Sequence, residues 1–126
     1  MIGVDTSSFV SYLRGDTGED VAVLDEALRE RQVALPPVVV TEVLSEPSLS
    51  VELRAMILAL PTLEVTADYW SRAGQMRSML LARRLKARVG DALIAQSCLD
   101  HGVALLTRDR DFRHFARYCG VRLVVE

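Results

Sequence analysis

The sequence predicts a single α/β domain over residues 1–126, with a parallel sheet covered by helices on both faces. Short apolar runs alternate with segments whose apolar residues recur at helical spacing, which is typical of parallel strands joined by helices. The runs carry few polar side chains, as strands buried on both faces require. The length of 126 residues suits one domain with its own core.

Five apolar runs are predicted to form the strands of the sheet. Each run is short and is bounded by residues that favour turns or begin helices. In chain order the expected strands are residues 1–4, 33–35, 63–65, 103–106 and 121–125.

Seven helices are predicted to connect these strands, because their apolar residues recur every three or four positions. Pro36 and Pro37 suit the start of the third helix, and Gly102 suits the end of the sixth. We expect a first helix that ends at Gly15, a second around residues 21–28, and further helices over residues 38–45, 49–60, 68–84, 91–100 and 112–118.

Basic residues gather in the second half of the chain, although the net charge is only −2. Residues 1–63 hold 4 basic and 10 acidic side chains, whereas residues 64–126 hold 11 basic and 7 acidic ones. Nearly all the basic residues are arginine, whose guanidinium pairs well with phosphate oxygens. If these arginines share one face of the protein, that face can bind nucleic acid. On charge alone, a solvated helix face is the simpler interpretation.

The composition excludes several classes of protein. Half of the residues are apolar, which excludes a disordered chain. No apolar run approaches the roughly 18 residues that a membrane span needs, and no secretory signal is visible at the N-terminus. Cys98 and Cys119 lack metal-binding spacing, so we expect free thiols in a cytoplasmic protein.

Four carboxylates fall where a sheet of this kind binds ligands. Asp5 ends the first strand and Asp109 closely follows the fourth, and the carboxyl ends of parallel strands line the binding crevice. Asp91 opens a helix on its core-facing side, and Glu42 lies on the helix after the second strand. Each alone could be a helix cap or a surface acid. A cation is one way to compensate carboxylates buried together.

The chemistry of these residues indicates a hard cation. Oxygen ligands without histidine or cysteine suit Mg²⁺, or alternatively Mn²⁺, better than Zn²⁺. Such ions activate water and hold phosphate oxygens.

Four segments of the chain resemble those of PIN-domain ribonucleases, and within that group those of VapC-type toxins of toxin–antitoxin systems. The resemblance extends over essentially the whole chain. It is carried by the segments Val4-Asp5-Thr6-Ser7, Thr41-Glu42-Val43-Leu44, Gly90-Asp91-Ala92-Leu93-Ile94-Ala95 and Leu106-Thr107-Arg108-Asp109-Arg110-Asp111-Phe112. The resemblance implies a PIN-like three-layer sandwich whose five-stranded parallel sheet has the order 3-2-1-4-5.

The resemblance also implies roles for particular residues. By position, Asp5, Glu42, Asp91 and Asp109 match the acidic quartet of the family, which would be catalytic and hold Mg²⁺ or Mn²⁺. Asp109 and Asp111 lie two residues apart, and either could be the fourth acid, although we prefer Asp109 and expect Asp111 to cap the next helix. The expected supporting residues are Ser7, Thr107 and Asp111, and the expected RNA-binding residues are Arg83, Arg84, Lys86, Arg88, Arg108 and Arg110.

The function implied is a Mg²⁺-dependent endoribonuclease, the toxin of a type II toxin–antitoxin (VapBC) system, that leaves a 5′-phosphate and a 3′-hydroxyl. The resemblance further implies a homodimer and a VapB-type antitoxin. The nearly all-apolar helix predicted at residues 49–60 would contribute to the antitoxin groove or to the dimer surface, although burial in the core explains it equally well. The alternatives are a catalytically inactive binding module with the same fold, and a PIN nuclease in RNA processing that has no antitoxin.

Overall fold

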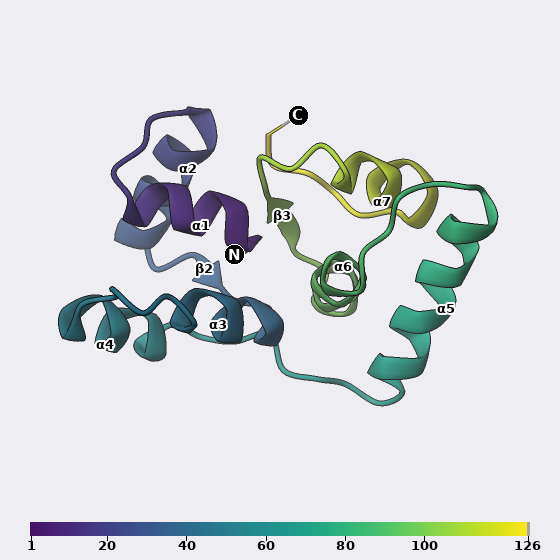
Figure 1. The fold of residues 1–126 in the computed structure, drawn as a ribbon, viewed down its shortest axis with the longest axis horizontal. Helices are drawn as coiled ribbons and strands as arrows, with labels where there is room; N and C mark the ends of the chain where they lie inside the picture. Colours follow the sequence, from purple (N-terminus) through teal and green to yellow (C-terminus); the bar gives the residue numbers. More distant parts are fainter. Residues whose placement is uncertain (126) are drawn as a thin grey trace.

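The computed structural model of the protein describes residues 1–125, and within them the chain forms three strands and seven helices (Figure 1). The strands are β1 (Ile2–Val4), β2 (Val33–Ala34) and β3 (Ala104–Leu106). The helices are α1 (Thr6–Leu13), α2 (Glu19–Arg29), α3 (Pro37–Leu44), α4 (Val51–Ala59), α5 (Tyr69–Ala82), α6 (Val89–His101) and α7 (Phe112–Cys119).

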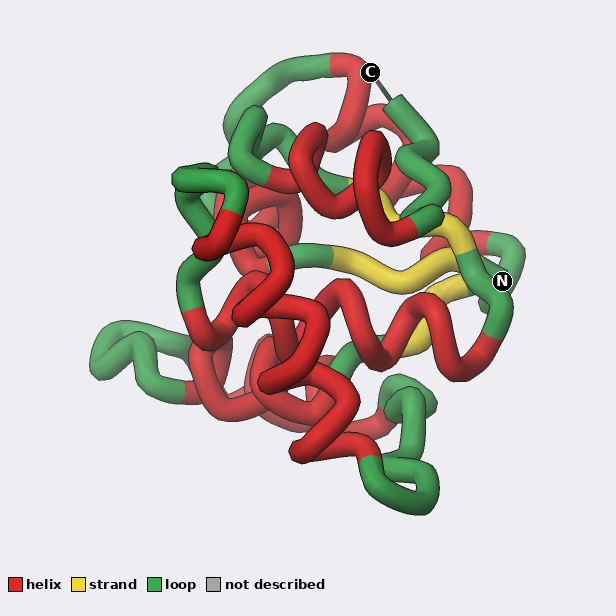
Figure 2. The backbone as a smooth tube through the Cα atoms, turned by 90° about the vertical axis from the view of Figure 1, so that its right-hand side faces the viewer, coloured by secondary structure: helices red, strands yellow, loops and turns green. Residues whose placement is uncertain are grey.

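The strands form a parallel sheet in the order β2-β1-β3, with β1 at its centre. Ile2 pairs with Val33 on one side and with Ala104 on the other. Figure 2 shows helices above and below the strands. The predicted fold class, an α/β domain with a parallel sheet between helices, is therefore confirmed.

The prediction of five strands is wrong for this structure, because each expected outer strand is reduced to one bridge. Thr62 bridges to Leu35, beyond β2, and Leu123 bridges to Leu105 of β3. Both bridges are parallel, and they lie on the sides where the order 3-2-1-4-5 would place the outer strands.

Prolines explain why the edge beyond β2 does not extend. The Leu35 N–H donates to the carbonyl of Pro61 (2.9 Å), and the Leu63 N–H donates to the carbonyl of Leu35 (2.9 Å). In a parallel ladder the next donors along would be Pro37 and Pro61, and proline has no N–H. At the opposite edge Leu105 makes both bonds of its bridge, and the chain turns into the Thr107–Asp111 loop two residues later.

The core holds α6 close against β1. Val4 on the strand and Ile94, Ala95 and Cys98 on the helix are all buried. A Cβ atom at Gly3 would lie 2.7 Å from the Cys98 sulfur, so only glycine allows the strand and helix to approach this closely.

The helices follow the predicted positions with ends shifted by a few residues. The helix predicted from Asp91 begins at Val89, which puts Asp91 in its first turn, and it stops at Gly102 in the left-handed region (φ 62°). Helix α4 buries only Ile57, whereas Val51 and Leu58 are 79% and 62% exposed, so burial in the core does not explain its apolar character. No helix in the described part of the chain is long and apolar enough to cross a membrane.

Candidate metal centre

The first acidic residue of the candidate centre is Asp5, which lies at the carboxyl end of β1. Asp5 is 5% exposed and caps α1, where its Oδ1 accepts from the Thr6 N–H (2.8 Å). Its Oδ2 accepts from the hydroxyls of Ser7 (2.7 Å) and Thr107 (2.8 Å). Burial raises the pKa of Asp5, and these hydrogen bonds oppose the rise because they favour the carboxylate.

Thr107 connects the ends of two strands. Its hydroxyl donates to Asp5 after β1 and accepts the N–H of Asp109 after β3 (3.0 Å). Thr107 is itself buried, so these bonds are protected from water. The side chain therefore fixes the position of the loop that carries Asp109 relative to Asp5.

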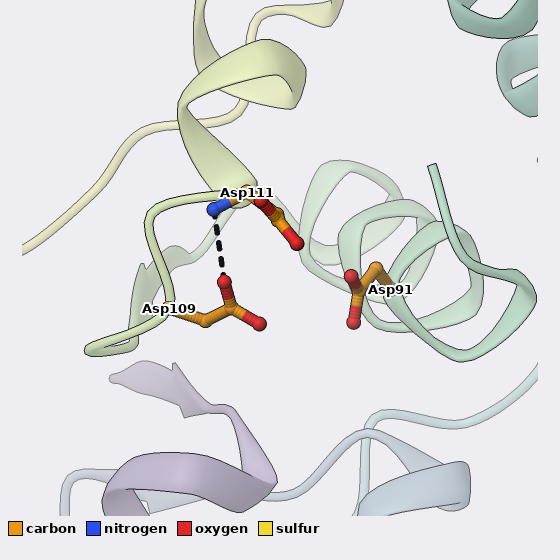
Figure 3. A group of neighbouring side chains, drawn as sticks. All are labelled: Asp91, Asp109 and Asp111. Carbon is orange, nitrogen blue, oxygen red and sulfur yellow. Dashed lines mark hydrogen bonds between the residues drawn. The ribbon is translucent and has the colours of Figure 1, made fainter. Parts of the chain in front are cut away.

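Three aspartates lie close enough together to share one cation. Oxygen atoms of Asp91, Asp109 and Asp111 lie within 4.8 Å of one another. Figure 3 shows the three carboxylates directed toward one another, one from α6 and two from the loop before α7. The group brings together residues from two segments of the chain that meet beside the sheet.

Asp91 has the least favourable environment of the three. Its Oδ2 is buried and has no hydrogen-bond partner among residues 1–125. Burial, followed by the negative charges of Asp5 and Asp109, raises the pKa of Asp91 to about 6, and the charge of Arg88 opposes this rise. An ionised carboxylate that is buried without a partner is costly, so this site favours either a proton or a cation.

The structure brings the predicted quartet together only in part. Asp91 and Asp109 lie in the close group, and Asp5 is near enough for its charge to act on Asp91. Glu42 lies outside the group and is exposed, and its Oε1 accepts from the Thr6 hydroxyl (3.0 Å). Thr6 directly follows Asp5 in the chain, so this hydrogen bond connects Glu42 to the start of α1 beside the centre.

Asp111 joins the group and does not cap α7. It stands at the N-cap position of that helix but makes no side-chain capping bond there. Its N–H instead donates to Asp109 Oδ1 (2.9 Å), which turns the loop so that both carboxylates face the centre. The expected capping role of Asp111 is therefore wrong, and the geometry admits Asp109 and Asp111 together.

The predicted RNA-binding residues occupy different environments. Arg108 donates twice to Asp20 (2.9 Å to each carboxylate oxygen), which also accepts from the Ser8 hydroxyl. The guanidinium of Arg83 lies 4.6 Å from the centre of the Tyr118 ring. The other four are Arg84, Lys86, Arg88 and Arg110, all of them exposed.

Two contacts beside the centre were missed by sequence reasoning. The Arg108–Asp20 pair spans 88 residues, and Asp20 is itself buried. Lys86 pairs with Asp111 across 3.1 Å. Neither pair has a sequence signal, because each joins two segments that are distant in the chain and meet only in the fold.

The residues present fit a hard divalent cation. The close group offers only carboxylate oxygens, which are the preferred ligands of Mg²⁺ and Mn²⁺. The buried Asp91 Oδ2 without a partner is the atom that such an ion would satisfy. Asp91, Asp109 and Asp111 would hold the ion, and the buried Asp5 stands beside them. Fold and site together define an α/β domain with an acidic centre at the end of its sheet.

Comparison with known proteins identifies the family. The model of the PIN domain family matches residues 2–118. Ribonuclease VapC11 of Mycobacterium tuberculosis and a VapC ribonuclease of Mycobacterium bovis are each 31% identical over 125 residues, which cover 93% of this chain and 92% of either relative. The chain therefore belongs to the PIN domain family, within which it resembles the VapC ribonucleases.

A solved structure shows the same fold. FitAcB from Neisseria gonorrhoeae matches with a TM-score of 0.71 over 98% of this chain and 96% of that chain, at 22% identity. This agreement extends over nearly the full length of both chains, so the arrangement of elements is typical of the fold.

Proposed function

We propose that the protein is a divalent-metal-dependent endoribonuclease that acts as the toxin of a VapBC-type toxin–antitoxin system. One observation carries the proposal: Asp91 Oδ2 is buried and has no hydrogen-bond partner in residues 1–125. This carboxylate lies beside those of Asp109 and Asp111. The similarity to ribonucleases named VapC supports RNA as the substrate.

The proposed mechanism assigns distinct roles to the acidic residues. Asp91, Asp109 and Asp111 would hold Mg²⁺ or Mn²⁺, with Asp5 and Glu42 completing the site directly or through water. When bound, the ion supplies an activated water and stabilises negative charge on the phosphate. Thr107 and Ser7 favour the ionised form of the Asp5 carboxylate and hold it in one orientation by donating to its Oδ2.

Exposed basic residues near the centre are proposed to hold the RNA backbone. Arg84 and Arg88 flank Lys86 in the segment before α6, and Arg110 lies between two of the acids. Contacts of this kind position the substrate without reading its sequence. We do not assign Arg108 to this role, because both of its bonds to Asp20 commit it to the fold.

Cleavage of a structured RNA by the purified protein tests the proposal. We expect activity with Mg²⁺, none with a chelator present, and a loss of about 100-fold or more in Asp5→Asn. Asp25→Asn is the matched control, since Asp25 pairs with Arg29 on the surface of α2. Undiminished, metal-independent cleavage by a folded Asp5→Asn protein would contradict the proposed centre. A natural chain that neither cleaves RNA nor is stabilised by Mg²⁺ would instead favour the inactive binding module.

The antitoxin is proposed to bind in a groove beside Glu42 that has both apolar and polar walls. The groove has a volume of about 520 Å³ and lies between α1, α3 and α4. Its apolar lining includes Leu13, Val43 and Leu53, and Glu42 and Arg14 also line it. An amphipathic segment can place its apolar side against such a groove.

Two positions on α4 separate antitoxin binding from the proposed homodimer. Leu53 lines the groove, whereas Leu58 is 62% exposed and does not line it. We expect Leu53→Asp to weaken binding of the antitoxin by at least tenfold, and Leu58→Asp to weaken dimerisation. Calorimetry with the antitoxin and analytical ultracentrifugation measure the two effects, and each variant is the control for the other.

A further inference from the structure

The segment between α5 and α6 presents a lysine to the acidic centre. Lys86 Nζ lies 3.1 Å from Asp111 Oδ2, and the two side chains are 55% and 24% exposed. Lys86 is the single lysine of the sequence, and the other 14 residues of the Lys and Arg total are arginines. The pair therefore puts a compact ammonium group at the outer rim of the Asp91–Asp109–Asp111 group.

The backbone on both sides of Lys86 is anchored. The Leu85 N–H donates to the carbonyl of Leu80 (3.1 Å), and the Arg77 guanidinium donates to the carbonyl of Ala87 (2.7 Å). Ala87 is buried, and Arg84 adopts the left-handed conformation (φ 61°) that turns the chain. The direction of Lys86 is thus set by its neighbours in the turn.

The charge of Lys86 compensates only part of the centre. Asp111 receives the ammonium, but the buried Asp91 Oδ2 has no partner among residues 1–125. Arg108, although adjacent to Asp109 in the chain, is turned away to Asp20. An ammonium on one carboxylate also repels any divalent cation that the same carboxylate helps to hold.

We propose that Lys86 is a resident counter-cation of the acidic centre, which competes with the divalent ion for Asp111 and so makes the protein bind that ion more weakly than its carboxylates alone would. The inference rests on the proposed function, because it concerns the same metal centre. In this proposal Lys86 acts through the Asp111 carboxylate and takes no part in bond breaking.

Titration of the purified protein with Mn²⁺ by calorimetry tests the proposal. Removing a positive charge within a few ångströms of a divalent ion, at an effective dielectric near that of water, tightens binding about five- to tenfold. We therefore expect Lys86→Met to bind Mn²⁺ about five- to tenfold more tightly than the natural chain. Lys86→Arg keeps the charge and should bind like the natural chain.

Arg29→Met is the matched control. Arg29 and Asp25 form an exposed ion pair of the same length, 3.1 Å, on α2. Its removal changes the net charge equally and should leave Mn²⁺ affinity unchanged. Asp91→Asn should abolish the titration in every background, which shows that the heat comes from this centre.

The outcomes separate this inference from the proposed function. If the natural chain binds Mn²⁺ through Asp91 but Lys86→Met binds it equally or more weakly, the inference is wrong and the nuclease proposal stands. If neither chain binds Mn²⁺, the metal centre itself is refuted and the inference with it. Thermal unfolding of Lys86→Met is expected to match the natural chain, because exposed ion pairs contribute little.

Discussion

Two aspartates on the same helix, nine residues apart, have opposite environments. Asp91 lies in the first turn of α6, and its pKa is raised to about 6. Asp100 lies near the other end, and its pKa is lowered to about 2 because Arg72 donates to both of its oxygens. Asp100 also accepts from Gln96 (2.9 Å) and Thr66 (2.8 Å), so all its charge is matched locally.

The helix dipole would give the reverse order. A carboxylate is favoured at a helix N-terminus and disfavoured at the C-terminus, by roughly 0.3–1 kcal/mol. At Asp91, burial and two neighbouring acids outweigh this effect, and at Asp100 a paired arginine does so. The comparison teaches that Asp100 is satisfied by the fold, whereas Asp91 is held by the fold in a place where only a proton or an added cation satisfies it.

The largest expected contrast between the two aspartates is in RNA cleavage. Asp91→Asn removes a carboxylate of the proposed metal centre and is expected to reduce cleavage about 100-fold or more. Asp100→Asn leaves the centre intact and should stay within about twofold of the natural chain. Initial rates with Mg²⁺ on one structured RNA measure both, and equal losses in the two variants would erase the distinction.

The next contrast is in the stability of the metal-free protein. Asp91→Asn relieves burial of a charge and repulsion by its neighbours, so the free energy of unfolding should rise by about 1–2 kcal/mol at pH 7, allowing for solvent near this half-buried group. Asp100→Asn should lower it by about 1 kcal/mol, because Arg72 loses its charged partner. Urea unfolding with a chelator present measures both changes, and changes of the same sign would contradict the comparison.

A smaller effect is expected in the dependence of stability on pH. The pKa of Asp91 is about 6 in the folded protein and 3.8 in the unfolded chain, so the folded state binds more protons between these values. Asp91 therefore contributes stability at low pH that is lost as the pH rises through 6, about 0.5–1 kcal/mol between pH 5 and pH 7 after discounting for solvent. The difference in unfolding free energy between the natural chain and Asp91→Asn should shrink by this amount at pH 5. A difference that is constant with pH would show that Asp91 does not titrate in this range.

Much of the fold was predictable because it depends on local patterns. The apolar run before Asp5 and the run before Thr107 each form a strand. The residues that follow these strands meet at the carboxyl end of the sheet, where Thr107 donates to Asp5. Apolar content predicts a strand at residues 63–65, but the missing N–H groups of Pro37 and Pro61 prevent a longer ladder beyond β2.

The parts of the site that were not predictable depend on contacts between segments that are distant in the chain. No local sequence pattern predicts that Asp20 pairs with Arg108, 88 residues further along, or that Lys86 pairs with Asp111, 25 residues further along. The expected role of Arg108 in holding RNA and the expected capping by Asp111 both came from neighbours in the sequence. In the structure, each side chain is instead determined by a neighbour in space.

The close approach of Gly3 to Cys98 provides a built-in reporter of the site. Cys98 lies on the helix that carries Asp91, and burial raises the pKa of its thiol to about 12, so the folded protein keeps it unreactive. A thiol reagent can modify it only when α6 separates from β1, which is the same movement that would carry Asp91 away from Asp5. In a chain whose more exposed Cys119 is replaced by serine, the labelling rate of Cys98 would therefore report how often the acidic centre opens.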